Sequence, residues 1–285
     1  MSVNSNVCVL YSGQLRSWAQ VIDTHLELFK QFKSIKVFAH FWDDEDPAEI
    51  QSFYNCLNDV SNIEVTLIVE SIDEQLYTKY VKRVASVGYM KNSIWMLSGM
   101  TSVFRNSDVI RSNYDRVIRL RYDIRVMYNL TKNSDADLLM HMWANEKVFF
   151  DGFFVLSGRV ACKFYENLLE NFFALAESHQ VEAPEFIISY LLHNAGATNF
   201  ASDDSRAEII LINGELGPCF YQHKNRTIFQ KFKSDMAMII RVNRGGVSVL
   251  NNSSLNQYLF GNFFYRAILL IAVFIRNSYV YQAIR

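Results

Sequence analysis

The chain has 285 residues, of which 50% are hydrophobic, with 22 Phe, 15 Tyr and only 3 Pro. These values predict a packed globular protein, either one large domain or a domain with an appendage, and they exclude a disordered or low-complexity chain. The net charge is −1, but residues 231–285 hold seven basic residues and one acidic residue, so that segment carries +6 and the rest −7. The C-terminal segment is therefore expected to meet an anionic surface.

Short apolar runs alternate with stretches of helical periodicity in the N-terminal part. Strands are expected at residues 7–10, 35–39 and 63–69, with helices over 17–32 and 49–57. This alternation predicts an α/β fold with a mainly parallel central sheet. Because ligands bind at the carboxyl ends of parallel strands, a site is expected near residues 12–14 and 40–42.

Further elements follow in the second half of the chain. We expect a long helix over 93–111, strands at 117–123, 137–140, 148–150 and 153–158, helices over 159–178 and 184–193, and short strands and loops after 199. Residues 259–275 predict an apolar helix. Its uninterrupted apolar span between Arg266 and Arg276 is nine residues, whereas about twenty are needed to cross a bilayer. This helix is expected either to lie on a membrane or to dock on the body.

The most informative stretch is residues 114–123, Y-D-R-V-I-R-L-R-Y-D. In a strand, the period of two would place Arg119, Arg121 and Asp123 on one face. Two guanidiniums and a carboxylate are costly to bury without charged partners, and a nucleoside diphosphate with a divalent metal would supply them. The alternative is a surface strand whose arginines and aspartate pair with each other in solvent. For one of the two arginines, a further alternative is a structural ion pair with Asp115, Asp137 or Asp151.

The cysteines and the N-terminus bear on the compartment. Four scattered cysteines without C-x-x-C spacing predict neither a zinc site nor a disulfide framework. The N-terminus lacks a basic segment followed by a long apolar one, so we expect no signal peptide and a cytoplasmic setting. Nucleic-acid binding is not expected, because the basic excess lies beside an apolar tail and not in a polar stripe.

Five short motifs occur in order over about residues 7–193 and together resemble a family of bacterial and viral surface-polysaccharide glycosyltransferases. They are S-G-x-x-R at 12–16, H-x-W at 40–42, Y-D-x-V-I-R-x-R-x-D at 114–123, a D-x-F-F-like element at 151–154 and P-E at 184–185. The resemblance implies a GT-A-like, Rossmann-like domain over 1–230, followed by the basic, apolar segment 231–285. It also implies transfer of a sugar, of the hexosyltransferase type, from a nucleotide-sugar donor to a lipopolysaccharide or capsule glycan.

The resemblance also assigns roles to residues. The nucleotide pocket is expected to be formed by Ser12, Gly13, Gln14, Arg16, Arg119 and Arg121. Asp123 is the counterpart of the D-x-D metal motif and would hold Mn²⁺ or Mg²⁺. Arg121 stands where the first Asp of that motif would be, so either a single carboxylate binds the metal or Arg121 takes over part of the charge neutralisation.

A transferase also needs a general base for the acceptor hydroxyl. Asp151 lies among phenylalanines, and Glu185 lies in the first turn of a predicted helix. The structural alternatives are a turn aspartate and a carboxylate favoured by the helix dipole. His40 and His223 are weaker candidates for the site.

Two other functions use the same residues. A phosphoryl or nucleotidyl transferase would place the same arginines and aspartate on a nucleotide. A non-catalytic protein that binds a glycan or a nucleotide sugar would need the pocket without turnover. For the transferase, the expected partners are the donor, a glycan or glycolipid acceptor, and peripheral contact of residues 259–285 with an anionic membrane, on the inner face of the cell membrane.

Overall fold

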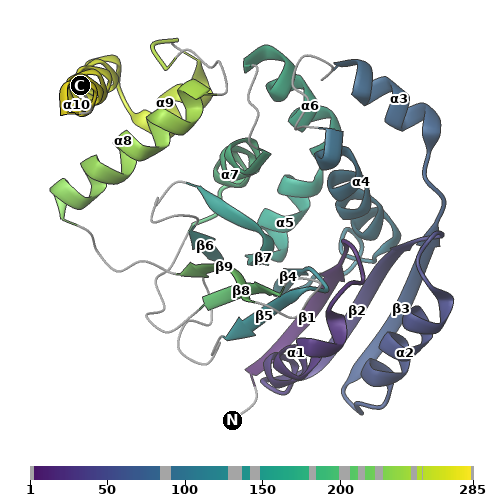
Figure 1. Cartoon of the computed structure of the whole chain (residues 1–285). Helices are drawn as coiled ribbons and strands as arrows, with labels where there is room; N and C mark the ends of the chain where they lie inside the picture. Colours follow the sequence, from purple (N-terminus) through teal and green to yellow (C-terminus); the bar gives the residue numbers. More distant parts are fainter. Residues whose placement is uncertain are drawn as a thin grey trace.

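The computed structural model describes residues 3–83, 91–127, 137–141, 148–179, 184–198, 206–210, 216–221, 227–244, 249–251 and 253–283. Within these residues nine strands form one sheet, in the order β3-β2-β1-β4-β7-β6-β9-β8-β5 (Figure 1). The strands are β1 (Val3–Tyr11), β2 (Phe32–Trp42), β3 (Ile63–Glu70), β4 (Arg116–Leu120), β5 (Ile124–Met127), β6 (Leu138–His141), β7 (Phe149–Ser157), β8 (Arg206–Ile210) and β9 (Leu216–Tyr221).

Helices surround this sheet. They are α1 (Ile22–Phe29), α2 (Pro47–Asn58), α3 (Glu74–Arg83), α4 (Lys91–Asn106), α5 (Gly158–Tyr165), α6 (Leu168–His179), α7 (Pro184–Asn194), α8 (Ile228–Arg244), α9 (Ser254–Phe260) and α10 (Phe263–Ala283), with a 3₁₀ turn at Trp18–Gln20. Figure 1 shows α1 and α2 on one side of the sheet and α4, α5 and α7 on the other.

The sheet has a parallel half and an antiparallel half. β1 pairs in parallel with both β2 and β4, and β2 pairs in parallel with β3, which gives the strand order of a Rossmann-like sheet. β7 runs antiparallel to β4, and the pairs beyond it are antiparallel as well. The predicted α/β fold is confirmed, with the parallel strands confined to the N-terminal half.

Two predicted helices are each divided in the structure. Residues 17–32 begin at Ser17, with φ 58°, and give the 3₁₀ turn and α1, which meet at Val21 (φ −122°), while Phe32 already belongs to β2. Residues 159–178 give α5 and α6, separated near Asn167 with φ 55°. The helical spacing of apolar residues continues across both breaks, so it does not predict them. Neither Ser17 nor Asn167 is a glycine, the residue type that most often adopts a positive φ.

Strand lengths around the central motif also differ from the prediction. β4 ends at Leu120, so Arg121 and Asp123 lie beyond the strand. The two strands expected on either side of Asp151–Gly152 are one continuous strand, β7. Its pairing with β4 carries the chain straight through these residues, because Leu120 pairs with Phe153 and the Arg121 amide donates to the Gly152 carbonyl (3.0 Å).

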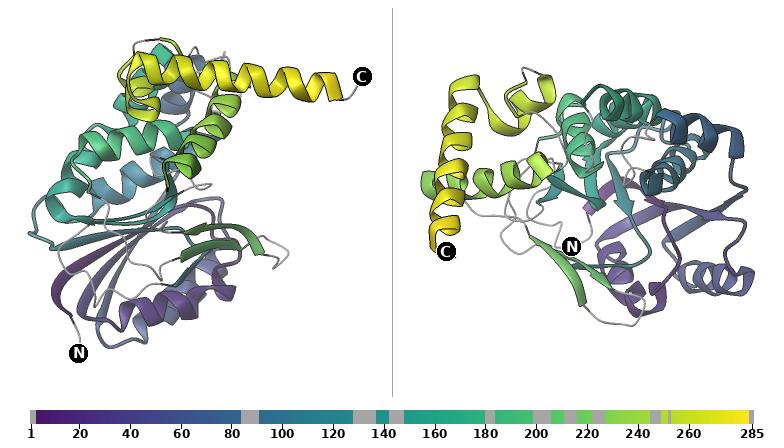
Figure 2. Two further views of the ribbon diagram at one scale, coloured as in Figure 1. Left: turned by 90° about the vertical axis from the view of Figure 1, so that its left-hand side faces the viewer. Right: turned by 45° about the horizontal axis from the view of Figure 1, so that its top comes forward.

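The C-terminal segment docks on the body through α9. Tyr258 packs against Tyr190 of α7, with ring centroids 5.7 Å apart. The chain then turns at Gly261, which has φ 73°, and α10 crosses α8 and extends outward in Figure 2. The helix predicted over 259–275 is therefore divided between α9 and α10.

A buried histidine ties the first helix to the end of the central strand. The Tyr11 hydroxyl lies 2.8 Å from His25 Nδ1, and His25 Nε2 lies 2.5 Å from the Ile124 carbonyl oxygen. Because the carbonyl can only accept, Nε2 carries the proton and Nδ1 accepts from Tyr11. Burial lowers the pKa of His25 from 6.5 to about 4, so the ring is neutral near pH 7.

The stability of the protein should therefore depend on pH through His25. Below about pH 6.5 the unfolded chain binds a proton that the folded chain takes up only near pH 4, so unfolding becomes easier as the pH falls through this window. The contribution is about 3 kcal/mol by pH 4. Urea unfolding of His25→Gln should show a shallower pH dependence than wild type. His193→Gln, at an exposed position on α7, should keep the wild-type slope; equal slopes in all three proteins would contradict the assignment.

Candidate functional site

The carboxyl ends of four parallel strands meet along one edge of the sheet. β1, β2, β3 and β4 end there at Tyr11, Trp42, Glu70 and Leu120. Because β7 runs antiparallel to β4, its first residues, Phe149 to Asp151, reach the same edge. Ligands of open α/β sheets bind at this position, so the edge is the candidate site.

An ion cluster forms where β4 ends. Arg121 donates from Nε to Asp123 Oδ1 (3.0 Å) and from Nη2 to Oδ2 (2.7 Å), and Arg16 Nε lies 3.4 Å from Oδ2. The side chains of Arg16 and Arg121 are 43% and 19% exposed, against 2% for Asp123. Burial alone would lower the pKa of Arg121. The charges of Asp123 and Asp151 outweigh this effect, so the pKa lies above its ordinary value. The cluster is therefore charged and open to solvent mainly through its arginines.

Arg119 does not belong to this cluster. It is fully buried, and its Nη1 donates to the Leu120 carbonyl. Its Nε and Nη2 have no hydrogen-bond partner among the described residues. Burial lowers the pKa of this guanidinium, while nearby Tyr165 and Asp151 raise it in part. The strand expected to run through Asp123 ends at Leu120, so Arg119 remains within β4 whereas Arg121 and Asp123 lie beyond it.

The alternative ion pairs of the sequence analysis are also accounted for. Asp115 accepts the Asn6 amide (2.8 Å), and Asp137 accepts the amides of Ser157 and Thr198. Both carboxylates bind main-chain N–H groups here. Asp123 is the carboxylate that takes Arg121.

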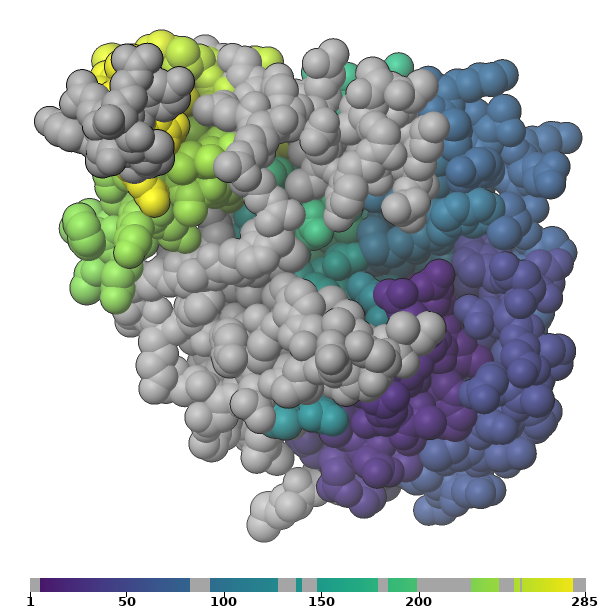
Figure 3. Space-filling model, in the orientation of Figure 1, coloured from purple at the N-terminus to yellow at the C-terminus, as the bar shows by residue number. Residues whose placement is uncertain are grey.

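The turn after β1 divides the four predicted pocket residues between surface and interior. Figure 3 shows the N-terminal part of the chain, in purple, at the molecular surface. Gln14 and Arg16 are exposed, whereas Ser12 is fully buried against α4 and does not line an open pocket. Gly13 has φ 130°, and a Cβ placed there would lie 3.5 Å from Arg121 Cγ. The turn therefore favours glycine for its backbone conformation, since the contact with Arg121 would be an ordinary van der Waals one.

The two general-base candidates lie on different elements, Asp151 on β7 and Glu185 on α7. Asp151, on β7, is 7% exposed, and its charge acts on both Arg119 and Arg121. Glu185 reaches the region through α7: the Ser189 hydroxyl accepts the Phe149 amide (2.7 Å) and donates to the Glu185 carbonyl (2.5 Å). The fold thus places Asp151 beside the arginines and links Glu185 to the start of the same strand. His223 lies outside the described residues.

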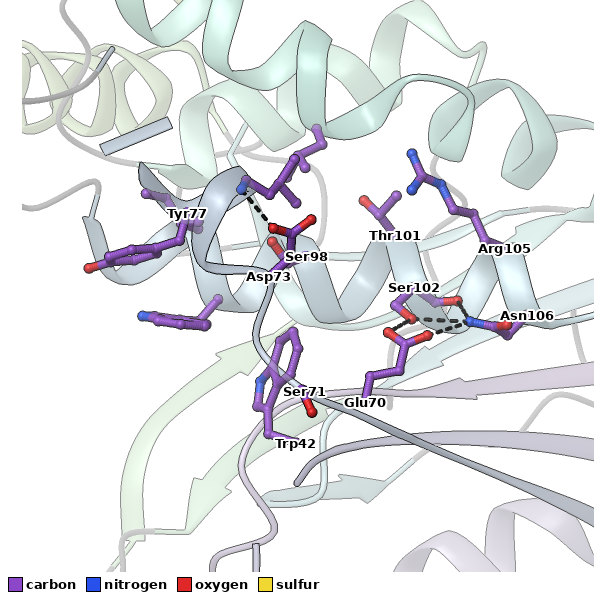
Figure 4. A pocket seen from close by; sticks show the side chains of 14 residues that line it. Trp42, Glu70, Ser71, Asp73, Tyr77, Ser98, Thr101, Ser102, Arg105 and Asn106 are labelled. Carbon is purple, nitrogen blue, oxygen red and sulfur yellow. Dashed lines mark hydrogen bonds between the residues drawn. The ribbon is translucent and has the colours of Figure 1, made fainter. Parts of the chain in front are cut away.

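A cavity of about 190 Å³ lies at the ends of β2 and β3, between them and the helices α3 and α4 (Figure 4). Tyr77 stacks on Trp95 with centroids 4.6 Å apart, and Trp42 meets Trp95 edge-on at 5.7 Å. Glu70 accepts from Ser102 and Asn106 at its rim. Sequence reasoning singled out Trp42 but missed Tyr77 and Trp95, whose helices come to this edge only through tertiary packing.

A divalent metal does not fit the described part of this site. Both oxygens of Asp123 already accept from guanidiniums. Across the described ranges, no three His, Cys, Asp or Glu side chains converge as a metal-binding group. The carboxylate expected to hold Mn²⁺ or Mg²⁺, Asp123, thus lies between two positive charges.

Comparisons with known proteins give weak likenesses. No family model and no curated protein matches the sequence. Among solved structures, the apo form of the glycosyltransferase GlyE of Streptococcus pneumoniae TIGR4 has 12% identity and a TM-score of 0.41 over 70% of this chain, which spans only 45% of that one. A structure described as a transferase mutant has 9% identity and a TM-score of 0.34, over 71% of this chain and 93% of that one. The PaToxG glycosyltransferase has 10% identity and a TM-score of 0.35, over 93% and 87%. At these values the likeness does not assign an activity to this chain.

The turn at Gly13 gives a direct test of the site's local structure. Gly13→Ala should lower the free energy of unfolding by about 1–3 kcal/mol, because alanine is strained at φ 130°. Gly196→Ala is the matched control, since Gly196 also has positive φ (90°) but would place its Cβ in open space. Both variants should lose stability in urea unfolding. A Gly13→Ala protein as stable as wild type would contradict the described turn.

Proposed function

We propose that this chain is a glycosyltransferase with a GT-A-like fold, which moves a sugar from a nucleotide-sugar donor to a lipopolysaccharide or capsule-type glycan. The observation that carries the proposal is the occurrence of the Arg16–Asp123–Arg121 cluster and an aromatic cavity at the same carboxyl edge of the parallel strands. The ordered motifs of the sequence point to the same class of reaction.

The diphosphate and the nucleobase of the donor suit the arginine cluster and the aromatic cavity, respectively. Arginine suits phosphate in geometry and charge, so the diphosphate belongs at Arg16 and Arg121. The aromatic faces of Trp42, Trp95 and Tyr77 suit the flat nucleobase. Neighbouring strands lie about 4.8 Å apart, so about 10–14 Å separates β4 from β2 and β3, a span that an extended nucleoside diphosphate can cover.

The chemistry then follows from the charges at the edge. The acceptor oxygen forms a bond to the anomeric carbon, the bond from that carbon to the phosphate oxygen breaks, and the nucleoside diphosphate leaves with the electron pair. Arg16 and Arg121 stabilise the negative charge that develops on this leaving group. Asp151, buried beside them, is the favoured group to take the acceptor's proton, with Glu185 as the second candidate.

A panel of UDP-, GDP-, CMP- and dTDP-sugars, read by thermal shift, tests the proposal. One nucleotide class should raise the melting temperature by mass action, and Trp95→Ala should reduce that shift while Trp18→Phe, outside the cavity, should not. No shift with any donor would refute donor binding at this edge.

The same protein separates the transferase from its rivals. Asp151→Asn should bind the donor as wild type does but lose most sugar transfer to the acceptor. A wild-type protein that binds a donor without turnover would be a binding protein, and transfer of the phosphate instead of the sugar would identify a phosphoryl or nucleotidyl transferase.

The membrane part of the proposal rests on α10. Leu269 and Val273 are buried toward α8, the Tyr265 hydroxyl donates to Asp235 (2.8 Å), and Arg266 Nη1 donates to the Asn251 carbonyl (2.8 Å). The opposite face exposes six large apolar side chains: Phe263, Phe264, Ile268, Ile271, Phe274 and Ile275. In the described residues no single helix is long and apolar enough to span a membrane, although α9 and α10, bent by 65°, meet the length and composition requirement together.

This apolar face fits the surface of an anionic membrane on the cytoplasmic side. Residues 231–285 carry +6, and exposed Lys233 and Arg276 lie on the same two helices. Amphipathic helices with such charge bind by burying apolar side chains while lysine and arginine meet anionic lipid. A lipid-linked acceptor would be reached from this position.

Vesicle sedimentation of the full chain tests the membrane contact. Wild type should bind phosphatidylglycerol-containing vesicles, less so at high salt, and Phe264→Ser with Phe274→Ser should weaken binding about tenfold or more. Ile110→Ser removes an equally exposed apolar side chain far along the chain from α10 and should change nothing. Equal sedimentation of all variants would contradict membrane binding by this face. A dimer in solution that is lost with the double substitution would show that the face binds a second copy of the chain instead.

A further inference from the structure

The carboxylate expected to hold a metal is already occupied by arginine. An ionised carboxylate offers about four acceptor sites. Arg121 takes one on each oxygen, and Arg16 takes a further one on Oδ2. Because Asp123 is 2% exposed, little of the remaining capacity faces solvent. A divalent cation could bind there only after displacing these hydrogen bonds.

The charge at the cluster also opposes a cation. Two guanidiniums and one carboxylate sum to +1, and the sum is still +1 when the neighbouring charges of Arg119 and Asp151 are included. Both Arg16 and Arg121 lie within 3.4 Å of the carboxylate oxygens. A divalent cation on Asp123 would stand beside both of them at short range, where like charges repel strongly. A diphosphate, in contrast, is attracted by the same net charge.

The arginines keep hydrogen-bond donors for such an anion. A guanidinium has five N–H groups. Arg121 donates to Asp123 from Nε and from one Nη2 hydrogen, and Arg16 donates to it from Nε alone. Among the residues that the structure describes, both Nη1 groups and the remaining Nη2 hydrogens have no hydrogen-bond partner, and the Arg16 side chain is 43% exposed.

The main chain holds Arg121 in place before any ligand arrives. Its amide donates to the Gly152 carbonyl (3.0 Å), and its side chain lies next to the turn at Gly13, where an added Cβ would be in van der Waals contact with its Cγ (3.5 Å). Together with the two-point bond to Asp123, these contacts fix the direction of the guanidinium. Charge fixed in advance stabilises a leaving anion without a further cost of reorganisation.

We infer that the chain binds the diphosphate of its donor without a divalent cation, with Arg16 and Arg121 neutralising the phosphates and Asp123 positioning the two arginines. This inference rests on the proposed function. It makes Asp123 a positioning residue and not a metal ligand.

The test is calorimetric titration of the full chain with the nucleoside diphosphate selected by the donor panel, in EDTA and in Mn²⁺. The dissociation constants should agree within about twofold. Arg121→Gln and Arg16→Gln should each weaken binding in EDTA about tenfold or more, the usual effect of losing a charged hydrogen bond. Arg159→Gln, at an exposed position on α5 away from the edge, should bind as wild type does.

Asp123→Asn distinguishes positioning from metal binding. It removes a negative charge beside the diphosphate, so nucleotide binding in EDTA should stay within a few-fold of wild type or tighten. Turnover should fall in kcat with KM little changed, because the arginines lose their fixed direction. Arg121→Lys, which keeps the charge without the fork, should retain part of the affinity and shows whether a weak Arg121→Gln protein has merely misfolded.

The outcomes separate this inference from the proposed function. Binding that requires Mn²⁺ and is abolished by EDTA or by Asp123→Asn overturns the inference and leaves a metal-dependent transferase. Failure of every nucleotide to bind, with or without Mn²⁺, overturns the proposed function and the inference with it.

Discussion

The short strand β4 is the constraint on which the site depends. It pairs in parallel with β1 on one side and antiparallel with β7 on the other, through only five residues, all of them buried. This one junction brings together the turn after β1, the residues that follow Leu120 and the start of β7. Without it, Gly13, Arg121 and Asp151 would have no common location, since 30 or more residues separate them along the chain.

The end of β4 also concentrates charge at one place. Arg119, still inside the strand, is buried and has no salt bridge among the described residues, although the charge of Asp151 acts on it, whereas Arg121, two residues on, has a matched partner in Asp123. Burying charge is costly unless it is paired and hydrogen-bonded. The chain satisfies this condition locally at Arg121 and leaves the arginines, and not the aspartate, directed to solvent. An anion is therefore the ligand that this edge suits.

Much of the fold follows from local sequence, and the site follows only in part. Continuous apolar runs identified β1, β2 and β3, and Asp46–Pro47 marks the start of α2 by a side-chain cap (2.9 Å to the Ala48 amide). Such signals lie within a few residues of the element they predict. The left-handed conformations of Ser17 and Asn167 left no such signal, because neither residue type requires a positive φ. Short strands and loops are expected after residue 199, but residues 228–244 form the helix α8, so that prediction is wrong there.

The site escaped prediction where it depends on long-range pairing. Local pattern placed Asp151–Gly152 between two strands, but pairing with β4 draws them into one. The motif drew attention to Arg121 and Asp123, and their mutual ion pair is the contact that its structural alternative predicts. Tyr77 and Trp95 belong to helices with ordinary apolar faces, and only their packing against Trp42 makes a cavity.

A crystal structure with the bound nucleoside diphosphate tests the central claim most directly. The account predicts phosphate oxygens within hydrogen-bond distance of Arg16 and Arg121, with the base in the cavity of Trp42, Tyr77 and Trp95. A nucleotide bound elsewhere, or a diphosphate held by a cation on Asp123 with both guanidiniums turned away, would contradict it.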